Sequence, residues 1–256
     1  MSLNQKISDW QGRRVWLVGA STGIGLACAQ ALRAAGAQVV VSARNPQGVA
    51  QWAEQDTGVQ WRALDVCDGP QVQATAQALL AEGSLDMVVY AAGYYQAQRA
   101  SAMDLAEMLK HDKVNYQGAL QVIDAVLPGM LAQGRGHISF LSSVAGWRGL
   151  PNGLAYGPTK AALTHLAETL YLDLQDQGID VSVVNPGFVA TPLTAQNQFT
   201  MPALISPEEA AREMLKGWAK GQFDIHFPKR FTLWLKLLRV LPYRLYFPLV
   251  RRFTGL

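Results

Sequence analysis

A strand, a glycine-rich turn and a helix follow one another near the beginning of the chain, and this unit constrains the fold most strongly. The apolar run Arg14 to Val18 predicts a buried strand, and Gly19-Ala20-Ser21-Thr22-Gly23-Ile24-Gly25 follows it. Residues 26–32 then have helical spacing. Glycines let the backbone approach a phosphate, and the first turn of the next helix offers it free N–H groups. The unit therefore predicts an α/β fold with a phosphate-binding turn.

The rest of the chain continues this alternation of strands and helices. Further strands are predicted at Gln38 to Ala43, Val59 to Leu64, Leu85 to Tyr90, Ile138 to Leu141, Ile179 to Val184 and Phe223 to Phe227. Helices are predicted at about 70–81, 103–131, 155–176 and 206–220. Parallel crossovers need such intervening helices. We predict one Rossmann-like, doubly wound domain with a seven-stranded parallel sheet over residues 1–228, followed by a helical extension over residues 229–256.

Length and composition fit this architecture. The chain has 256 residues, half of them hydrophobic, which suffices for one large core. Its two cysteines, Cys28 and Cys67, lie in segments that read as a helix and a strand end, which indicates reduced thiols. The polar N-terminus shows no apolar secretory segment. We therefore expect a cytoplasmic protein.

The stretch from Ser142 to Lys160 carries the strongest signal for chemistry. On a helix beginning near Ala155, Tyr156 and Lys160 share one face. A cation beside a phenol favours the ionised form, which would lower the pKa of Tyr156 and make it a better proton donor. Ser143 follows a predicted strand, at the sheet edge where open α/β sheets bind ligands. Such pairs also occur on ordinary half-exposed helices, so the spacing alone leaves both interpretations open.

The end of the second predicted strand bears on the cofactor. An Asp or Glu there would accept a hydrogen bond from the ribose of NAD and repel a 2′-phosphate. This chain instead has Ser42-Ala43-Arg44-Asn45, and a guanidinium can pair with a phosphate through two parallel N–H bonds. A solvated loop arginine is the alternative. The sequence favours NADP(H) over NAD(H).

Six motifs in order make the chain resemble the classical short-chain dehydrogenase/reductase family over roughly residues 13–227. They are the turn Gly19 to Gly25, Asp65, Asn115, Ser143, the pair Tyr156 and Lys160, and the turn Pro186 to Thr191. The resemblance implies hydride transfer between NADP(H) and a ketone or secondary alcohol. It also implies a homodimer or homotetramer paired through the helices that hold Asn115 and Tyr156.

The resemblance assigns a role to each catalytic residue. Tyr156 would donate the proton in reduction, and Lys160 would hold the nicotinamide ribose and lower the pKa of Tyr156. Ser143 would hydrogen-bond the substrate oxygen, and Asn115 would anchor a water that relays protons. No metal ligand is implied. The implied cofactor-binding residues are Gly19, Ser21, Gly23, Ile24, Gly25, Arg44, Asp65, Val66, Ala91, Gly93, Tyr156, Lys160, Pro186, Gly187, Val189 and Thr191.

One departure from the family pattern is visible after the fourth predicted strand. The family usually has Asn-Asn-Ala-Gly where this chain has Tyr90-Ala91-Ala92-Gly93. The missing asparagine at Ala91 removes a structural hydrogen bond, worth about 1 kcal/mol. We expect altered stability and retained chemistry.

Residues 229–256 form a distinctive tail. They carry seven basic residues and no acidic one, so the net charge of +3 leaves −4 for the other residues. On a helix, Thr232, Lys236, Arg239 and Tyr243 would form a narrow polar stripe on an otherwise apolar rod. The segment is too short and charged to span a bilayer, which needs about 20 apolar residues. The charge asymmetry indicates a surface or partner for the tail and argues against a nucleic-acid-binding domain.

Three interpretations of the tail stay open. It lies in a membrane interface, it walls a hydrophobic pocket or joins subunits, or it is a packed C-terminal extension. The first two imply a hydrophobic substrate such as an acyl, lipid or steroid-like ketone. Residues 194–204 are predicted to form a mobile loop over the site. A non-catalytic NADP-binding sensor or scaffold, and an NAD-dependent dehydrogenase of a small soluble alcohol, remain alternatives.

Overall fold

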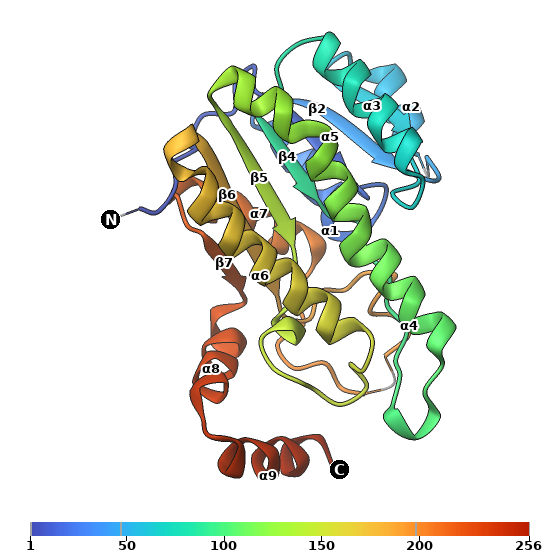
Figure 1. Cartoon of the computed structure of the whole chain (residues 1–256), viewed down its shortest axis with the longest axis vertical. Helices are drawn as coiled ribbons and strands as arrows, with labels where there is room; N and C mark the ends of the chain where they lie inside the picture. Colours follow the sequence, from blue (N-terminus) through green and yellow to red (C-terminus); the bar gives the residue numbers. More distant parts are fainter. Residues whose placement is uncertain (1, 47, 198, 256) are drawn as a thin grey trace.

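The computed structural model describes residues 2–46, 48–197 and 199–255 and places their strands in one seven-stranded parallel sheet (Figure 1). The strands are β1 (Arg14–Val18), β2 (Gln38–Ala43), β3 (Val59–Ala63), β4 (Met87–Tyr90), β5 (Gly136–Leu141), β6 (Ile179–Pro186) and β7 (Asp224–Phe227). Their order is β3-β2-β1-β4-β5-β6-β7, which reverses direction between β1 and β4. The predicted doubly wound sheet is confirmed. Gln198 of the predicted loop and Leu256 of the predicted extension lie outside the described residues.

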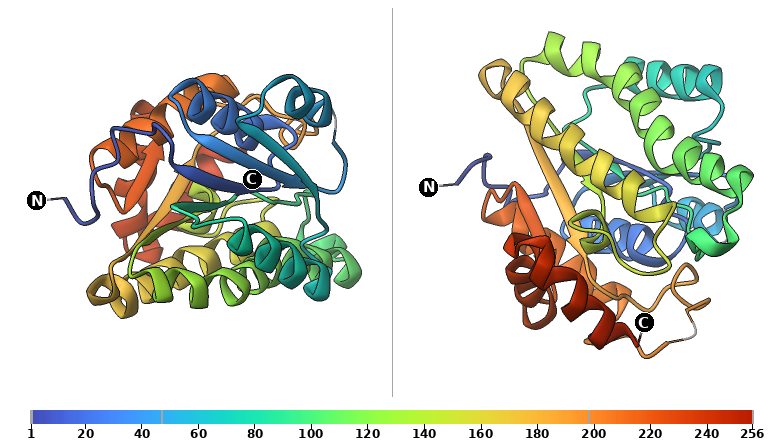
Figure 2. Two further views of the ribbon diagram at one scale, coloured as in Figure 1. Left: turned by 90° about the horizontal axis from the view of Figure 1, so that it is seen from above. Right: turned by 60° about the horizontal axis from the view of Figure 1, so that its bottom comes forward.

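Helices cover both faces of the sheet (Figure 2). One face carries α1 (Gly23–Ala34), α2 (Val49–Gln55) and α7 (Pro207–Ala219), and the other α3 (Gly69–Ala81), α4 (Leu105–Asp112), α5 (Gly118–Gln133) and α6 (Tyr156–Leu174). Successive side chains of β1 alternate between the two cores: Trp16 and Val18 enter one, Val15 and Leu17 the other. Because both faces are buried, the strands read as continuous apolar runs.

Capping residues fix where two of the predicted helices begin. Ser206 Oγ accepts a hydrogen bond from the backbone N–H of Glu209 at 3.2 Å. In return, Glu209 Oε2 accepts one from the backbone N–H of Ser206 at 2.9 Å. This capping box opens α7 as predicted. The Asp68 side chain accepts from the backbone of Gln71 and opens α3, with a proline in the first turn.

The helical region predicted over 103–131 was wrong in detail. The structure has two helices there, α4 and α5, joined by a π-helical turn over Lys113–Gln117. Such turns frequently lie at functional sites, and this one contains Asn115. Helix α2 was not predicted, because its seven residues are too few to display a helical period.

The extension consists of two helices that project beyond the end of β7 (Figure 1). They are α8 (Lys229–Val240) and α9 (Tyr243–Thr254). Leu241 has extended backbone angles and precedes Pro242, so α8 cannot run on into α9. The predicted polar stripe is therefore wrong at Tyr243, which begins the second helix. Within the described residues, no helix is both long and apolar enough to cross a membrane.

Candidate active site

The turns that follow β1, β4 and β6 meet at one edge of the sheet. A Cβ on Gly19 would lie 2.3 Å from Ala92 Cα, and one on Gly23 would lie 3.1 Å from Thr191 Cγ2. Both glycines also have positive φ angles, +81° and +56°. Only glycine fits such close approaches with this backbone conformation. The predicted phosphate turn therefore directly contacts two other predicted parts of the site.

A cleft of about 210 Å³ opens at this edge, beside the reversal in strand order. Its lining residues are Gly19, Ser21, Thr22, Ala43, Arg44, Asn45, Leu64, Asp65, Val66, Ala92, Gly93 and Val114. Six of them were predicted: Gly19, Ser21, Arg44, Asp65, Val66 and Gly93. The other six flank predicted positions, and nothing in their side-chain types would have marked them beforehand.

The cleft has the features that a dinucleotide requires. Thr22 precedes α1 but its side chain makes no capping hydrogen bond, and the first turn of α1 has no acidic residue. The backbone N–H groups at the start of α1 are therefore available to a ligand. These donors and the positive end of the helix dipole suit a phosphate. Arg44 is exposed where β2 ends. The described residues contain no cluster of three or more metal-ligating side chains.

The remaining predicted cofactor residues lie outside the lining of this cleft. Gly25 is buried, and a Cβ there would come 2.8 Å from Ala20 Cα, so it allows α1 to approach the turn. The Ala91 N–H donates to Val18 O at 2.8 Å and joins β4 to β1. Gly23 and Ile24 lie in the first turn of α1, and Tyr156 and Lys160 lie on α6. The others, at the end of β6 and in the turn after it, are Pro186, Gly187, Val189 and Thr191.

Tyr156, Lys160 and Ser143 come together at the start of α6. Lys160 Nζ lies 5.5 Å from the centroid of the Tyr156 ring and donates to Leu141 O at 2.8 Å. Ser142 Oγ donates to Lys160 O at 2.8 Å. These two bonds tie the end of β5 to α6, which brings Ser143 to the tyrosine. Tyr156 and Lys160 lie on the same face of α6, as their spacing predicted.

Burial controls the protonation of this pair. Burial raises the pKa of Tyr156, and a hydrogen bond with Ser143 lowers it by less, so the pKa lies above the usual tyrosine value. Burial also lowers the pKa of Lys160 to about 7. The spacing argument expected a lowered tyrosine pKa because it treated Lys160 as a fixed cation, whereas a buried lysine gives up its proton more easily. Among the chain's own groups, Tyr156 is a neutral phenol that holds a proton to donate.

Asn115 is fully buried, and its side chain joins two elements of the site. Its Oδ1 accepts from Tyr94 N at 2.7 Å, and its Nδ2 donates to Tyr94 O and Thr159 Oγ1, each at 3.0 Å. Asn115 thereby fixes the segment after β4 against the first turn of α6. The proton relay that the resemblance assigns to it stays a prediction.

Sequence analysis missed Tyr95. Its ring centroid lies 5.0 Å from that of Tyr156 in an edge-to-face arrangement, and its backbone carbonyl accepts from Gln196 Nε2 at 2.7 Å. Tyr95 therefore borders the tyrosine and connects it with the loop over residues 194–204. It has no periodic pattern or motif around it, so its place could be seen only in the fold.

The buried lysine leads to a prediction about stability and pH. Because the folded-state pKa of Lys160 is about 7, the unfolded chain binds more protons than the folded one between pH 7 and the usual lysine value of 10.5. The cost of burying this lysine is therefore complete below pH 7 and fades as the pH rises. We expect the unfolding free energy of Lys160→Met, relative to wild type, to fall by at least about 1 kcal/mol between pH 7 and 10. Urea unfolding across this range measures it, and a constant difference would contradict the lowered pKa.

Comparison with known proteins agrees with this geometry. A family model described as short chain dehydrogenase matches residues 13–201, which include the glycine turn and the catalytic stretch. The chain belongs to the short-chain dehydrogenase family. The expected family membership and fold class are confirmed.

Several proteins of this family are similar to the chain. An uncharacterized oxidoreductase of Myxococcus xanthus is 36% identical over 251 residues, which cover 96% of this chain and 99% of that protein. A 2-keto-3-deoxy-L-fuconate dehydrogenase of Xanthomonas campestris is 32% identical over 73% of this chain and 61% of its own length. The crystal structure of a Burkholderia cenocepacia short chain dehydrogenase in complex with NADP superposes with a TM-score of 0.81 at 22% identity, covering 91% of this chain and 94% of that one. This last similarity concerns the fold.

Proposed function

We propose that this short-chain dehydrogenase reduces a ketone to a secondary alcohol on a hydrophobic substrate, with NADPH as the reductant. The observation that carries the proposal is the grouping of Tyr156 with Ser143 and Lys160 at the start of α6, where Lys160 Nζ lies 5.5 Å from the centroid of the Tyr156 ring. A sensor or scaffold has no need of such a proton donor.

The chemistry divides between the cofactor and the protein. A reduced nicotinamide supplies the hydride, that is, two electrons and one hydrogen, to the carbonyl carbon. As negative charge grows on the substrate oxygen, Tyr156 donates its proton to that oxygen and Ser143 donates a hydrogen bond. Lys160, whose pKa is about 7, can return a proton to the tyrosine near neutral pH. Asn115 positions the start of α6 through Thr159.

The preference for NADPH rests on Arg44. Its guanidinium is exposed at the end of β2 and lines the cleft beside Asn45, a place where an acidic residue would select NAD. A planar guanidinium binds a phosphate through two hydrogen bonds at once. Gly19, Ser21 and the start of α1 would hold the pyrophosphate, and Asp65 and Val66 would border the adenine.

Aromatic side chains beside Tyr156 and in the turn after β6 favour a hydrophobic substrate. Tyr95 stands against Tyr156. The ring centroid of Phe188, in the turn after β6, lies 5.6 Å from that of Phe199 and 5.6 Å from that of Phe231. Phe231 belongs to α8, so the extension contributes to this aromatic cluster, which supports the proposal that the tail walls a hydrophobic pocket. Such surfaces bind apolar ligands through area removed from water.

We further propose a homodimer or homotetramer that pairs through α5 and α6. Leu120 and Leu131 on α5 are 38% and 40% exposed, and Leu172 on α6 is 76% exposed. Exposed leucines on adjacent helices suit a subunit contact. A cytoplasmic location is part of the proposal and is supported by the free thiols of Cys28 and Cys67.

Oxidation of NADPH by the purified protein, with methyl ketones of increasing chain length, tests this function. We expect kcat/KM to rise about threefold to fourfold per added methylene until the pocket is filled, since each buried CH₂ contributes about 0.8 kcal/mol. Rates that are independent of chain length would contradict a hydrophobic substrate. Tight NADPH binding without turnover of any ketone would instead support the sensor.

A further inference from the structure

Helix α8 turns two polar side chains, Thr232 and Lys236, inward and several large apolar side chains outward. Thr232 is fully buried and its Oγ1 lies 2.7 Å from His226 Nδ1, while Lys236 Nζ pairs with Asp224 Oδ2 at 2.7 Å. On the opposite side of α8, Trp234 is 68% exposed, and Val240 at the end of the helix is 76% exposed. A helix on the surface of a water-exposed protein normally does the reverse.

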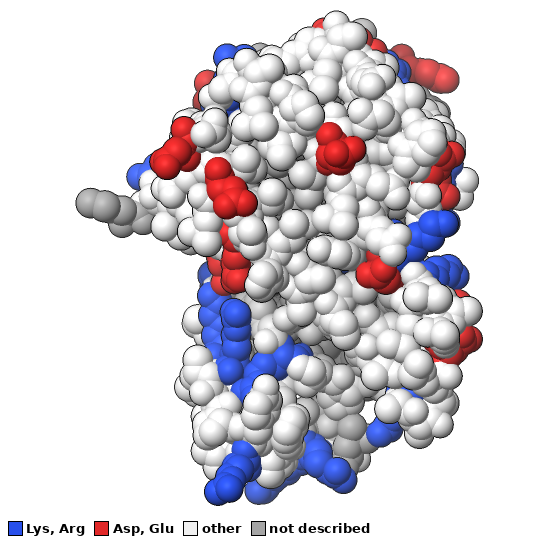
Figure 3. Space-filling model, in the orientation of Figure 1, with Lys and Arg blue, Asp and Glu red and all other residues white. Residues whose placement is uncertain are grey.

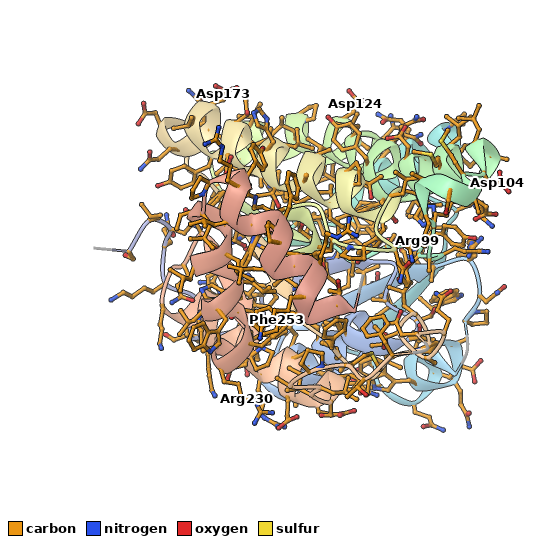
Figure 4. The ribbon with its side chains drawn as sticks, turned by 90° about the horizontal axis from the view of Figure 1, so that it is seen from below. Arg99, Asp104, Asp124, Asp173, Arg230 and Phe253 are labelled. Carbon is orange, nitrogen blue, oxygen red and sulfur yellow. The ribbon has the colours of Figure 1, made fainter. Side chains whose placement is uncertain are left out.

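Helix α9 continues the apolar surface. Tyr246 and Val250 face the body of the protein. Figure 4 looks onto α9 from its open side, where Phe253 is 78% exposed. The large apolar side chains exposed on the two helices are Leu233, Trp234, Leu237, Val240, Tyr243, Leu245, Phe247 and Phe253. So many large apolar side chains exposed on one segment mark an interaction site.

Arg148 fixes this outward orientation. Its Nη1 donates to the carbonyls that end α8, those of Leu238, Arg239 and Leu241, at 3.2, 3.2 and 2.6 Å. Its guanidinium also lies 4.0 Å from the ring centroid of Tyr246, whose hydroxyl donates to Gly149 O at 2.7 Å. These contacts satisfy helix-end carbonyls and hold the extension on the loop that follows Ser143. The apolar face is therefore a fixed surface of the folded chain.

Positive charge surrounds the apolar side chains. Six basic residues of the extension are exposed: Lys229, Arg230, Arg239, Arg244, Arg251 and Arg252. The extension contains no acidic residue, and the end of the molecule that it forms shows blue and white without red in Figure 3. Apolar and aromatic side chains among arginines suit the boundary between lipid head groups and acyl chains of an anionic bilayer.

We propose that the outward face of α8 and α9 docks this protein on the surface of an anionic lipid membrane. Charge decides between a membrane and a second copy of the chain. A twofold contact through the same face would bring two sets of arginines together without an acidic partner, whereas anionic head groups neutralise them. The loop after Ser143 then lies directly behind the docked extension, because Arg148 joins that loop to α8. This inference does not depend on the proposed reductase activity.

Vesicle cosedimentation of the full-length protein tests the proposal. Vesicles of phosphatidylcholine with about 30% phosphatidylglycerol are expected to bind the protein at least about tenfold more tightly than pure phosphatidylcholine, and added salt should weaken this binding. The double variant Trp234→Gln and Phe253→Gln should lose about tenfold or more in binding to the anionic vesicles. The variant Arg251→Gln and Arg252→Gln should lose about fivefold per charge on anionic vesicles only.

Matched controls lie outside the extension. Leu3→Gln near the N-terminus and Arg135→Gln just before β5 replace exposed residues of the same kinds and should leave vesicle binding unchanged. Thermal unfolding of each variant checks that it remains folded. NADPH oxidation is measured in a separate assay, so that failure of the membrane proposal can be told apart from failure of the reductase proposal. No binding of the wild type to anionic vesicles would overturn the inference. The inference would also be overturned if the double variant Trp234→Gln and Phe253→Gln dissociated an oligomer of the protein but still bound the vesicles.

Discussion

Tyr156→Phe is expected to lower kcat for ketone reduction by about 10³-fold, within the range measured for loss of a general acid. The substitution removes only the hydroxyl, and the ring keeps its edge-to-face contact with Tyr95. The affinity for NADPH should therefore stay within about threefold of the wild type. Steady-state oxidation of NADPH measures the first quantity, and the change in protein fluorescence on titration with NADPH measures the second.

Tyr171→Phe is the matched control for this experiment. Tyr171 lies near the other end of α6, and its hydroxyl donates to Leu3 O at 2.8 Å, far from the cleft. Its loss should change kcat less than about twofold. If Tyr156→Phe retained full activity, the role assigned to this hydroxyl, and with it the proposed mechanism, would be wrong.

Arg44→Asp is expected to reverse the cofactor preference. The change removes the donor for a 2′-phosphate and introduces a carboxylate that repels the phosphate and accepts from a ribose hydroxyl. We expect the ratio of kcat/KM for NADPH to that for NADH to fall by about 10²-fold or more. Because Arg44 is exposed and has no ion-pair partner among the described residues, the fold should tolerate the substitution.

Arg135→Asp controls for the general effect of the charge change. Arg135 is exposed at the beginning of β5, at the opposite edge of the sheet from the cleft. This variant should keep the wild-type ratio, since its charge lies more than a screening length from the cofactor site. An unchanged ratio in Arg44→Asp would show that another residue selects the cofactor.

Much of the fold and of the candidate site was predictable because the signals are local. Each strand is an apolar run bounded by turn residues, and the order of elements requires parallel crossovers. Ser206 with Glu209, and Gly19 with Gly23, mark a helix start and a phosphate turn by residue type alone. The helix face shared by Tyr156 and Lys160 likewise follows from spacing.

Other features of the site depend on distant contacts. The π-helical turn at Asn115 interrupts a region that looks like one helix, and its amide bonds reach Tyr94 and Thr159. Tyr95 stands beside Tyr156 without any motif that announces it. The direction of the tyrosine's pKa was mispredicted because spacing gives the position of a charge but not its burial.

The α/β class, the phosphate turn and the residues that carry the proposed chemistry follow from local patterns in the chain, since helical and strand periods and glycine conformations act over a few positions. The direction in which α8 faces depends instead on contacts with distant elements of the fold. On β7, Asp224 pairs with Lys236 of α8 and His226 hydrogen-bonds Thr232 of α8. Arg148 donates to the carbonyls at the end of α8. Buried polar groups must find partners, and those partners lie on other elements, so their pairing is what leaves the apolar side of α8 outward.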